Sequence, residues 1–307
     1  MTNLTKRIAV AAVGIPLAVG VVYLGGWFFT IAITLIALQA LREFYHLAES
    51  KHASPNQSVG LVWAAIILLW SGWVIASSSA RNNSSGPLNL HGLGVLVTGG
   101  YLCLFMLLGT LITLAAELFR ARENAMLNTA LTAFGVFYIG LSMACLFALR
   151  HVDRLFLWGT WGETGASLMM TLFVSVWLAD TAAYFVGLSI GKHKLFPRVS
   201  PKKSWEGAIG GVVGSTAAFI GMTKALIPTF PLDMAITCGV VIGIVGPIGD
   251  LAESLLKRDA VVKDSSGVLP GHGGIFDRFD SMLFAAPAVL VICYWEEIVS
   301  VLFGIEL

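Results

Sequence analysis

Charged residues are scarce in this sequence. They make up 12 % of its 307 residues, whereas 57 % are hydrophobic and the mean hydropathy is +0.82. Soluble globular domains carry about 25 % charged residues, so the composition excludes a water-soluble globule and indicates an integral membrane protein. The net charge of +1 gives no sign of a nucleic-acid partner, and none is expected.

Cysteine is also sparse. The four cysteines, Cys103, Cys145, Cys238 and Cys293, lie far apart inside apolar runs, without a CxxC pair or a Cys/His ligand spacing. We therefore interpret them as small buried hydrophobic residues rather than as a disulfide or a metal site. The apolar runs lack the period-two alternation of barrel strands as well, which leaves helices as the spanning elements.

The long apolar runs are what this sequence has in abundance. A helix needs ~20 apolar residues to cross a ~30 Å hydrocarbon layer. We expect spans near residues 8–25, 27–42, 59–77, 93–116, 127–149, 166–190, 207–227, 233–251 and 282–303. The predicted fold class is all-α, a polytopic membrane protein with about nine transmembrane helices.

The predicted organisation is a single membrane domain over residues 1–307 without a soluble appendage. Residues 1–165 are expected to form a scaffold that contacts lipid or a second copy of the chain, and residues 166–307 to carry the chemistry.

The basic residues predict the orientation, because Lys and Arg are retained on the cytoplasmic side. With the N-terminus cytoplasmic, fifteen of the 19 Lys and Arg residues fall in cytoplasmic segments and four on the opposite side. The two connections richest in charge, residues 192–206 and residues 250–280, then face the cytosol. The basic start followed by an apolar run resembles a signal peptide, but we expect an uncleaved first helix because a second span follows at once.

The first candidate site lies where the eighth span ends. Asp250, Glu253, Ser254 and Lys257 follow one another at i, i+3, i+4 and i+7, so a continuous helix places them on one face. Carboxylates suit a hard cation such as Mg²⁺, and a neighbouring base suits phosphate. The alternative is a solvated helix end with ordinary ion pairs.

The second candidate site is the glycine-rich run from Pro270 to Ser281. Glycines around His272 allow the backbone to approach a ligand, and Asp277 and Asp280 would share a face of the ninth helix. The start of that helix suits phosphate, with a metal bridging phosphate and acid. The alternative reads His272 as a polar turn residue and one aspartate as an N-cap.

The third candidate site is the connection from Lys192 to Glu206, which holds five Lys or Arg residues. It suits a lipid headgroup or a nucleotide phosphate, although an ordinary cytoplasmic loop would also be basic. Asp180 lies upstream inside the sixth span, where an acid is costly unless it has a partner, so we expect it to face the site.

The run from Ser254 to Asp280, SLLKRDAVVKDSSGVLPGHGGIFDRFD, resembles the signature of phosphatidate cytidylyltransferases, also called CDP-diacylglycerol synthases. The segment 200–207 and Asp180 resemble further features of that family. The resemblance implies that CTP and phosphatidate give CDP-diacylglycerol and pyrophosphate in phospholipid biosynthesis, with Mg²⁺ or Mn²⁺ as cofactor. It also implies a possible homodimer, and the compact chain favours a bacterial inner membrane.

This resemblance gives each candidate residue a role. Asp250 and Asp277 would be the principal metal ligands, supported by Asp180, Glu253 and Asp280. The catalytic set would be Asp250, Asp277, Lys257, Arg258 and Lys263. The substrate-binding set would be Ser200, Lys202, Lys203, Ser204, Asp264, His272, Gly273, Gly274 and Arg278. Phosphatidate brings its own anionic oxygen, so cations that reduce charge repulsion would be the main catalytic requirement.

Two alternatives belong to other classes. A CTP-dependent kinase of an isoprenoid alcohol would use similar phosphate contacts but would release CDP. A cation transporter could also hold Asp180 and Asp250 within helices, but its polar residues should extend across the full membrane depth.

Overall fold

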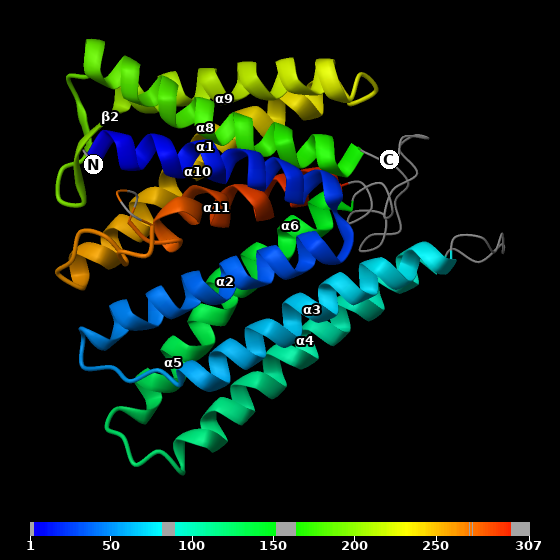
Figure 1. Cartoon of the computed structure of the whole chain (residues 1–307), viewed down its shortest axis with the longest axis vertical. Helices are drawn as coiled ribbons and strands as arrows, with labels where there is room; N and C mark the ends of the chain where they lie inside the picture. The colour runs from blue at the N-terminus through cyan, green and yellow to red at the C-terminus, as the bar shows by residue number, and fades with distance from the viewer. Residues whose placement is uncertain (1–2, 82–89, 152–163, 270, 272, 296–307) are drawn as a thin grey trace.

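The computed structural model describes residues 3–81, 90–151, 164–269, 271 and 273–295 (Figure 1). Over residues 3–150 the helices are α1 (Asn3–Leu24), α2 (Gly26–Glu49), α3 (Gln57–Arg81), α4 (Leu90–Glu117), α5 (Ala125–Gly135), the π-helix η1 (Val136–Leu141) and α6 (Ser142–Arg150). The later elements are α8 (Thr164–Ile190), β1 (Lys194–Phe196), β2 (Ser200–Ser204), α9 (Trp205–Leu226), α10 (Leu232–Asp259) and α11 (Phe276–Cys293). The prediction of an all-α architecture is confirmed.

Within the described residues, seven helices are long and apolar enough to cross a membrane. They are α2, α3, α4, α8, α9, α10 and the continuous unit of α5, η1 and α6. The structure thus supports a multi-pass membrane protein. α1 has a shorter apolar stretch, Ala12–Leu24, and three of the first five residues of α11 are charged. The count of nine spans stays a prediction.

The fifth predicted span, 127–149, is less regular than its sequence indicates. A π-helical segment separates α5 from α6, which inserts extra backbone into the helix. Gly135 lies just before it, and a Cβ there would meet Leu41 Cδ1 of α2 at 2.7 Å. This close approach packs the span against α2, whose residues Phe29, Leu41 and Tyr45 are fully buried.

Small residues repeat at four-residue spacing in α8 and α9, as at Ala183 and Gly187 and at Gly207 and Gly211, and this spacing predicts close helix packing. A Cβ at Gly207 would lie 2.7 Å from the carbonyl oxygen of Ala183, and one at Gly214 would lie 3.0 Å from that of Leu178. α9 also meets α10 closely, where Ser215 Oγ donates a hydrogen bond to the carbonyl oxygen of Gly239 (2.8 Å). Small side chains thus allow helix backbones to approach one another.

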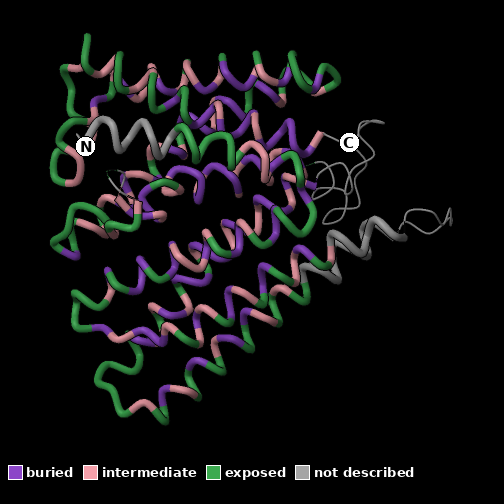
Figure 2. The backbone as a smooth tube through the Cα atoms, in the orientation of Figure 1, coloured by how far each residue is buried: buried purple, intermediate pink, exposed green. Residues whose placement is uncertain are grey.

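The charge-bearing connections lie at one end of the helix assembly. Figure 1 shows the β1–β2 hairpin, the α10–α11 connection and the α2–α3 connection at the same side of the view. Along the helices, buried and exposed residues alternate as they wind past their neighbours (Figure 2). Exposed apolar residues such as Leu107, Ile112 and Val213 suit contact with lipid.

Candidate active site

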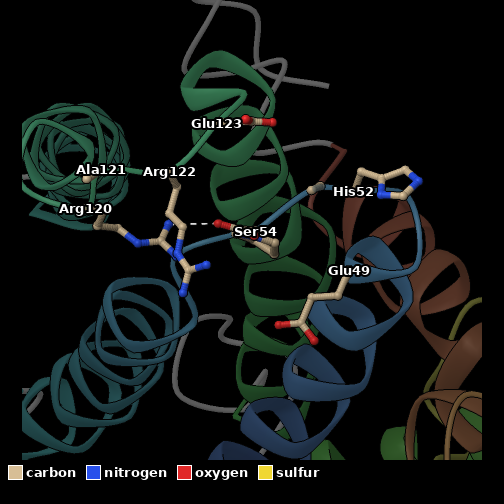
Figure 3. A pocket seen from close by; sticks show the side chains of 9 residues that line it. Glu49, His52, Ser54, Arg120, Ala121, Arg122 and Glu123 are labelled. Carbon is tan, nitrogen blue, oxygen red and sulfur yellow. Dashed lines mark hydrogen bonds between the residues drawn. The ribbon is translucent and has the colours of Figure 1, made fainter.

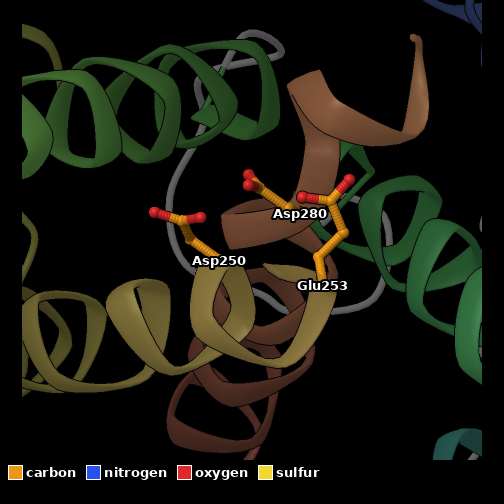
Figure 4. Close-up of side chains that lie close together, drawn as sticks. All are labelled: Asp250, Glu253 and Asp280. Carbon is orange, nitrogen blue, oxygen red and sulfur yellow. The ribbon is translucent and has the colours of Figure 1, made fainter. Parts of the chain in front are cut away.

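Three carboxylates gather where α10 and α11 meet at this end. Asp250 and Glu253 come from α10 and Asp280 from α11, and one oxygen of each lies within 4.8 Å of the others (Figure 4). The helical spacing of the first two was predicted, and α11 adds the third. Such a set of oxygen donors fits a hard divalent cation.

Glu253 is the most deeply buried of the three acids. Its side chain is 0 % exposed, and neither carboxylate oxygen accepts a hydrogen bond of good geometry from the described residues. Lys257 Nζ lies 2.8 Å from one oxygen as an ion pair. A buried carboxylate is costly unless its oxygens are paired, and the polar groups next to this one are the ammonium of Lys257 and the carboxyl of Asp277.

Asp277 has different surroundings from those three acids. Its Oδ1 accepts a hydrogen bond from Lys257 Nζ (2.7 Å), and its Oδ2 accepts from Gly274 N (2.7 Å) and Ser265 N (3.0 Å), with Ser265 Oγ 3.1 Å away. Lys257 therefore bridges Asp277 and Glu253. In this arrangement Asp277 holds the glycine-rich run in place next to the acidic cluster.

The hairpin brings one lysine of the third candidate site into contact with the first. β1 and β2 pair antiparallel, and Lys203 Nζ lies 2.5 Å from Asp250 Oδ2. Lys202, its neighbour on β2, is exposed. Ser204 Oγ accepts a hydrogen bond from Gly207 N (3.1 Å), so this predicted substrate contact is the N-cap of α9.

The other predicted residues divide by exposure. Asp180 on α8 is exposed within its helix and interacts electrostatically with Asp250, Lys203 and Arg278, as expected for an acid that faces the site. Ser200 is half-buried. Exposed residues are Arg258, Lys263, Asp264 and Arg278.

The glycine-rich run folds back on itself. Leu269 N donates to the carbonyl oxygen of Gly273 (2.9 Å), and Gly273 has a φ of +79°, a conformation that favours glycine. A Cβ at Gly273 would also lie 2.5 Å from Asp277 Oδ2. His272 lies outside the described residues, and its predicted role stays a prediction.

Comparison with known proteins decides the family. Residues 5–295 match the model of the cytidylyltransferase family. The chain belongs to the cytidylyltransferase family. Its enzyme class is therefore nucleotidyltransferase, as the resemblance implied.

Three bacterial relatives of this cytidylyltransferase are each named phosphatidate cytidylyltransferase. The Synechocystis protein is 33 % identical over 303 residues, which cover 93 % of this chain and 94 % of the relative. The Brucella suis protein is 32 % identical and covers 93 % and 92 %. The Bacillus subtilis protein is 31 % identical and covers 94 % and 96 %. The similarity extends over both halves of the chain.

Sequence reasoning missed one acidic residue of the cytidylyltransferase site. Glu43 lies near the end of α2, just beyond the predicted second span, and its side chain is 1 % exposed. It accepts hydrogen bonds from Ser265, Ser266, Ile275 and Phe276. The local sequence gave no signal, because Glu43 follows Arg42 at the end of an apolar run and these four partners lie more than 220 residues away.

A cavity in the N-terminal half is lined by none of the residues of the acidic cluster. It measures about 660 Å³ and lies between the α2–α3 and α4–α5 connections (Figure 3). Arg120 donates a hydrogen bond to the carbonyl oxygen of Ser54 (2.8 Å) and forms an ion pair with Glu117. Since its lining mixes Arg122 and His52 with Glu49 and Glu123, the cavity has no uniform charge for a nucleotide.

Proposed function

We propose that this chain is a phosphatidate cytidylyltransferase that uses CTP and phosphatidate to make CDP-diacylglycerol and pyrophosphate. The observation that carries the proposal is the match to relatives of that name over more than nine-tenths of the chain. The site supports it with acids and bases gathered next to one another at one end of the helices.

In the proposed reaction, an oxygen of the phosphatidate phosphate attacks the α-phosphorus of CTP. A new P–O bond forms, the bond from the α-phosphorus to the bridging oxygen breaks, and pyrophosphate leaves with its electron pair. The lipid phosphate is already anionic, so no side chain is needed as nucleophile. Charge repulsion between the two substrates is the main obstacle, and fixed cationic groups reduce it.

Asp250, Glu253 and Asp280 would hold Mg²⁺, or Mn²⁺ in its place, with Asp180 and Asp277 nearby. A bound divalent cation would neutralise phosphate charge and position the triphosphate. Lys203, which pairs with Asp250, and Lys257, which pairs with Glu253, would contact phosphate oxygens. The exposed Arg258, Lys263 and Arg278 would add positive charge for the leaving pyrophosphate.

The substrates also favour a location for this reaction. CTP is cytosolic and the phosphatidate headgroup lies at the membrane surface, so we propose that the charged end faces the cytosol at the inner membrane of a bacterium. The positive-inside distribution of Lys and Arg supports this orientation. A homodimer stays a prediction from the family resemblance.

The test is to incubate purified protein with phosphatidate, Mg²⁺ and CTP labelled at the α-phosphate, and to identify the labelled product. We expect label in CDP-diacylglycerol with one pyrophosphate released per lipid. Asp277→Asn should lower the rate at least 100-fold, because it removes the charge that holds Lys257 and the glycine-rich run. Asp259→Asn is the control, since Asp259 is exposed in the same segment and pairs only with the exposed Lys51 among the described residues.

Other outcomes would contradict the proposal. Release of CDP that depends on an added lipid alcohol would indicate the kinase. Absence of CTP turnover in folded protein, with ion flux in vesicles, would indicate the transporter.

A further inference from the structure

Glu43 is a carboxylate of the N-terminal half that lies inside the polar network of the C-terminal half. Its Oε1 accepts from Ser266 Oγ (2.7 Å) and Ile275 N (3.1 Å), and its Oε2 accepts from Phe276 N (2.8 Å) and Ser265 Oγ (2.9 Å). Gln39 Nε2, one turn earlier on α2, also donates to Oε1 (3.1 Å). Both oxygens are thus fully used: three of these five bonds come from the segment that joins α10 to α11, one from the first residue of α11 and one from α2.

These contacts fix the start of α11. The first backbone N–H groups of a helix have no partner within it and need an acceptor. For α11 that acceptor is the carboxylate of Glu43, whose negative charge also suits the positive end of the helix. The carboxylate of Glu43 therefore accepts the hydrogen bonds of the Ile275 and Phe276 N–H groups. From the sequence, the start of this helix was expected to bind phosphate instead.

Gly274 provides the space for this contact. A Cβ at this position would overlap Ser265 Oγ and Glu43 Oε2. Gly274 N meanwhile donates to Asp277 Oδ2 (2.7 Å), and Ser265 Oγ lies within hydrogen-bond distance of both Glu43 and Asp277. Glu43 and Asp277, an acid in the first turn of α11, are therefore linked in space through one residue, Ser265.

We propose that Glu43 is a positioning residue for the cytidylyl transfer. It holds the first turn of α11 so that Asp277 meets Lys257 and Asp280 meets Asp250 and Glu253. The inference rests on the proposed function and assigns the N-terminal half a direct part in it. Residues that orient the groups around a metal typically change metal affinity or activity 10–100-fold when they are mutated.

The experiment compares Glu43→Gln with Glu117→Gln. Both residues are buried glutamates of the N-terminal half, and Glu117 pairs with Arg120 rather than with the site. We expect Glu43→Gln to raise the Mg²⁺ concentration for half-maximal rate at least tenfold and to lower kcat/KM for CTP. Its hydrogen–deuterium exchange should rise in the peptide 264–280. Glu43→Asp should recover part of both effects.

The control separates positioning from general loss of stability. Glu117→Gln should lower the unfolding temperature while leaving the Mg²⁺ dependence and the exchange of peptide 264–280 within twofold of wild type.

Three results would overturn the inference. They are unchanged exchange in Glu43→Gln, raised exchange with wild-type kinetics and Mg²⁺ dependence, or an equal Mg²⁺ shift in Glu117→Gln. Wild-type protein that transfers no cytidylyl group would instead overturn the proposed function, and the exchange measurement would still decide whether Glu43 holds the loop.

Discussion

Two neighbouring lysines of β2 have different surroundings, and the difference predicts different roles. Lys203 pairs with Asp250, whereas Lys202 is exposed. We expect Lys203→Gln to lower kcat/KM for CTP at least tenfold, because a charge next to the acidic cluster is lost. Lys202→Gln should change it less than threefold, since exposed charges are screened by salt. Steady-state rates at 0.15 M salt measure both, and equal effects would contradict the assignment.

Glu253 allows a second prediction at this scale. Glu253→Gln keeps the volume of the side chain but removes the negative charge, so Lys257 keeps only Asp277 as a partner among the described residues. We expect the Mg²⁺ concentration for half-maximal rate to rise at least tenfold, because an oxygen ligand is replaced by a weaker one. Asp233→Asn, an exposed acid at the other end of α10, is the control. Unchanged Mg²⁺ dependence would place the cation elsewhere.

The contact between α10 and α11 depends on one glycine. A Cβ at Gly249 would lie 2.5 Å from the carbonyl oxygen of Asp280, whereas one at Gly246 would meet Ser281 Cβ at an ordinary 3.8 Å. We expect Gly249→Ala to destabilise the fold by about 1–3 kcal/mol and to lower the transfer rate. Gly246→Ala should be close to wild type in both. Thermal unfolding and the rate assay measure the pair, and a tolerated Gly249→Ala would show that the helices can separate without loss of the site.

The helices were predictable from the sequence because long apolar runs and small-residue spacings are local signals. The same holds for Asp250 and Glu253, which share a face through helical spacing alone. By contrast, the pair of Lys203 and Asp250 requires the hairpin to fold back on α10, and no local pattern contains that information. Glu43 escaped detection for the same reason, and the π-helix η1 has no spacing that distinguishes it from a regular helix.

The orientation of the whole molecule can be tested with single cysteines. In a variant whose four native cysteines are replaced by alanine, Val261→Cys places a thiol in the exposed α10–α11 connection and Thr229→Cys one in the α9–α10 turn. We expect a membrane-impermeant thiol reagent to label Thr229→Cys in intact spheroplasts and Val261→Cys only in inside-out vesicles. The reverse pattern would contradict a cytosolic active site.

The bonds of Glu43 have a consequence for the synthesis of the protein. Ile275 follows Glu43 by 232 positions, which at ~5–20 residues per second takes the ribosome about 10–50 s. Until residue 265 is made, Gln39 is the only one of the described donors to this carboxylate that exists. A chain that stops before Ser265 therefore leaves water to solvate the Glu43 carboxylate in place of its four later donors.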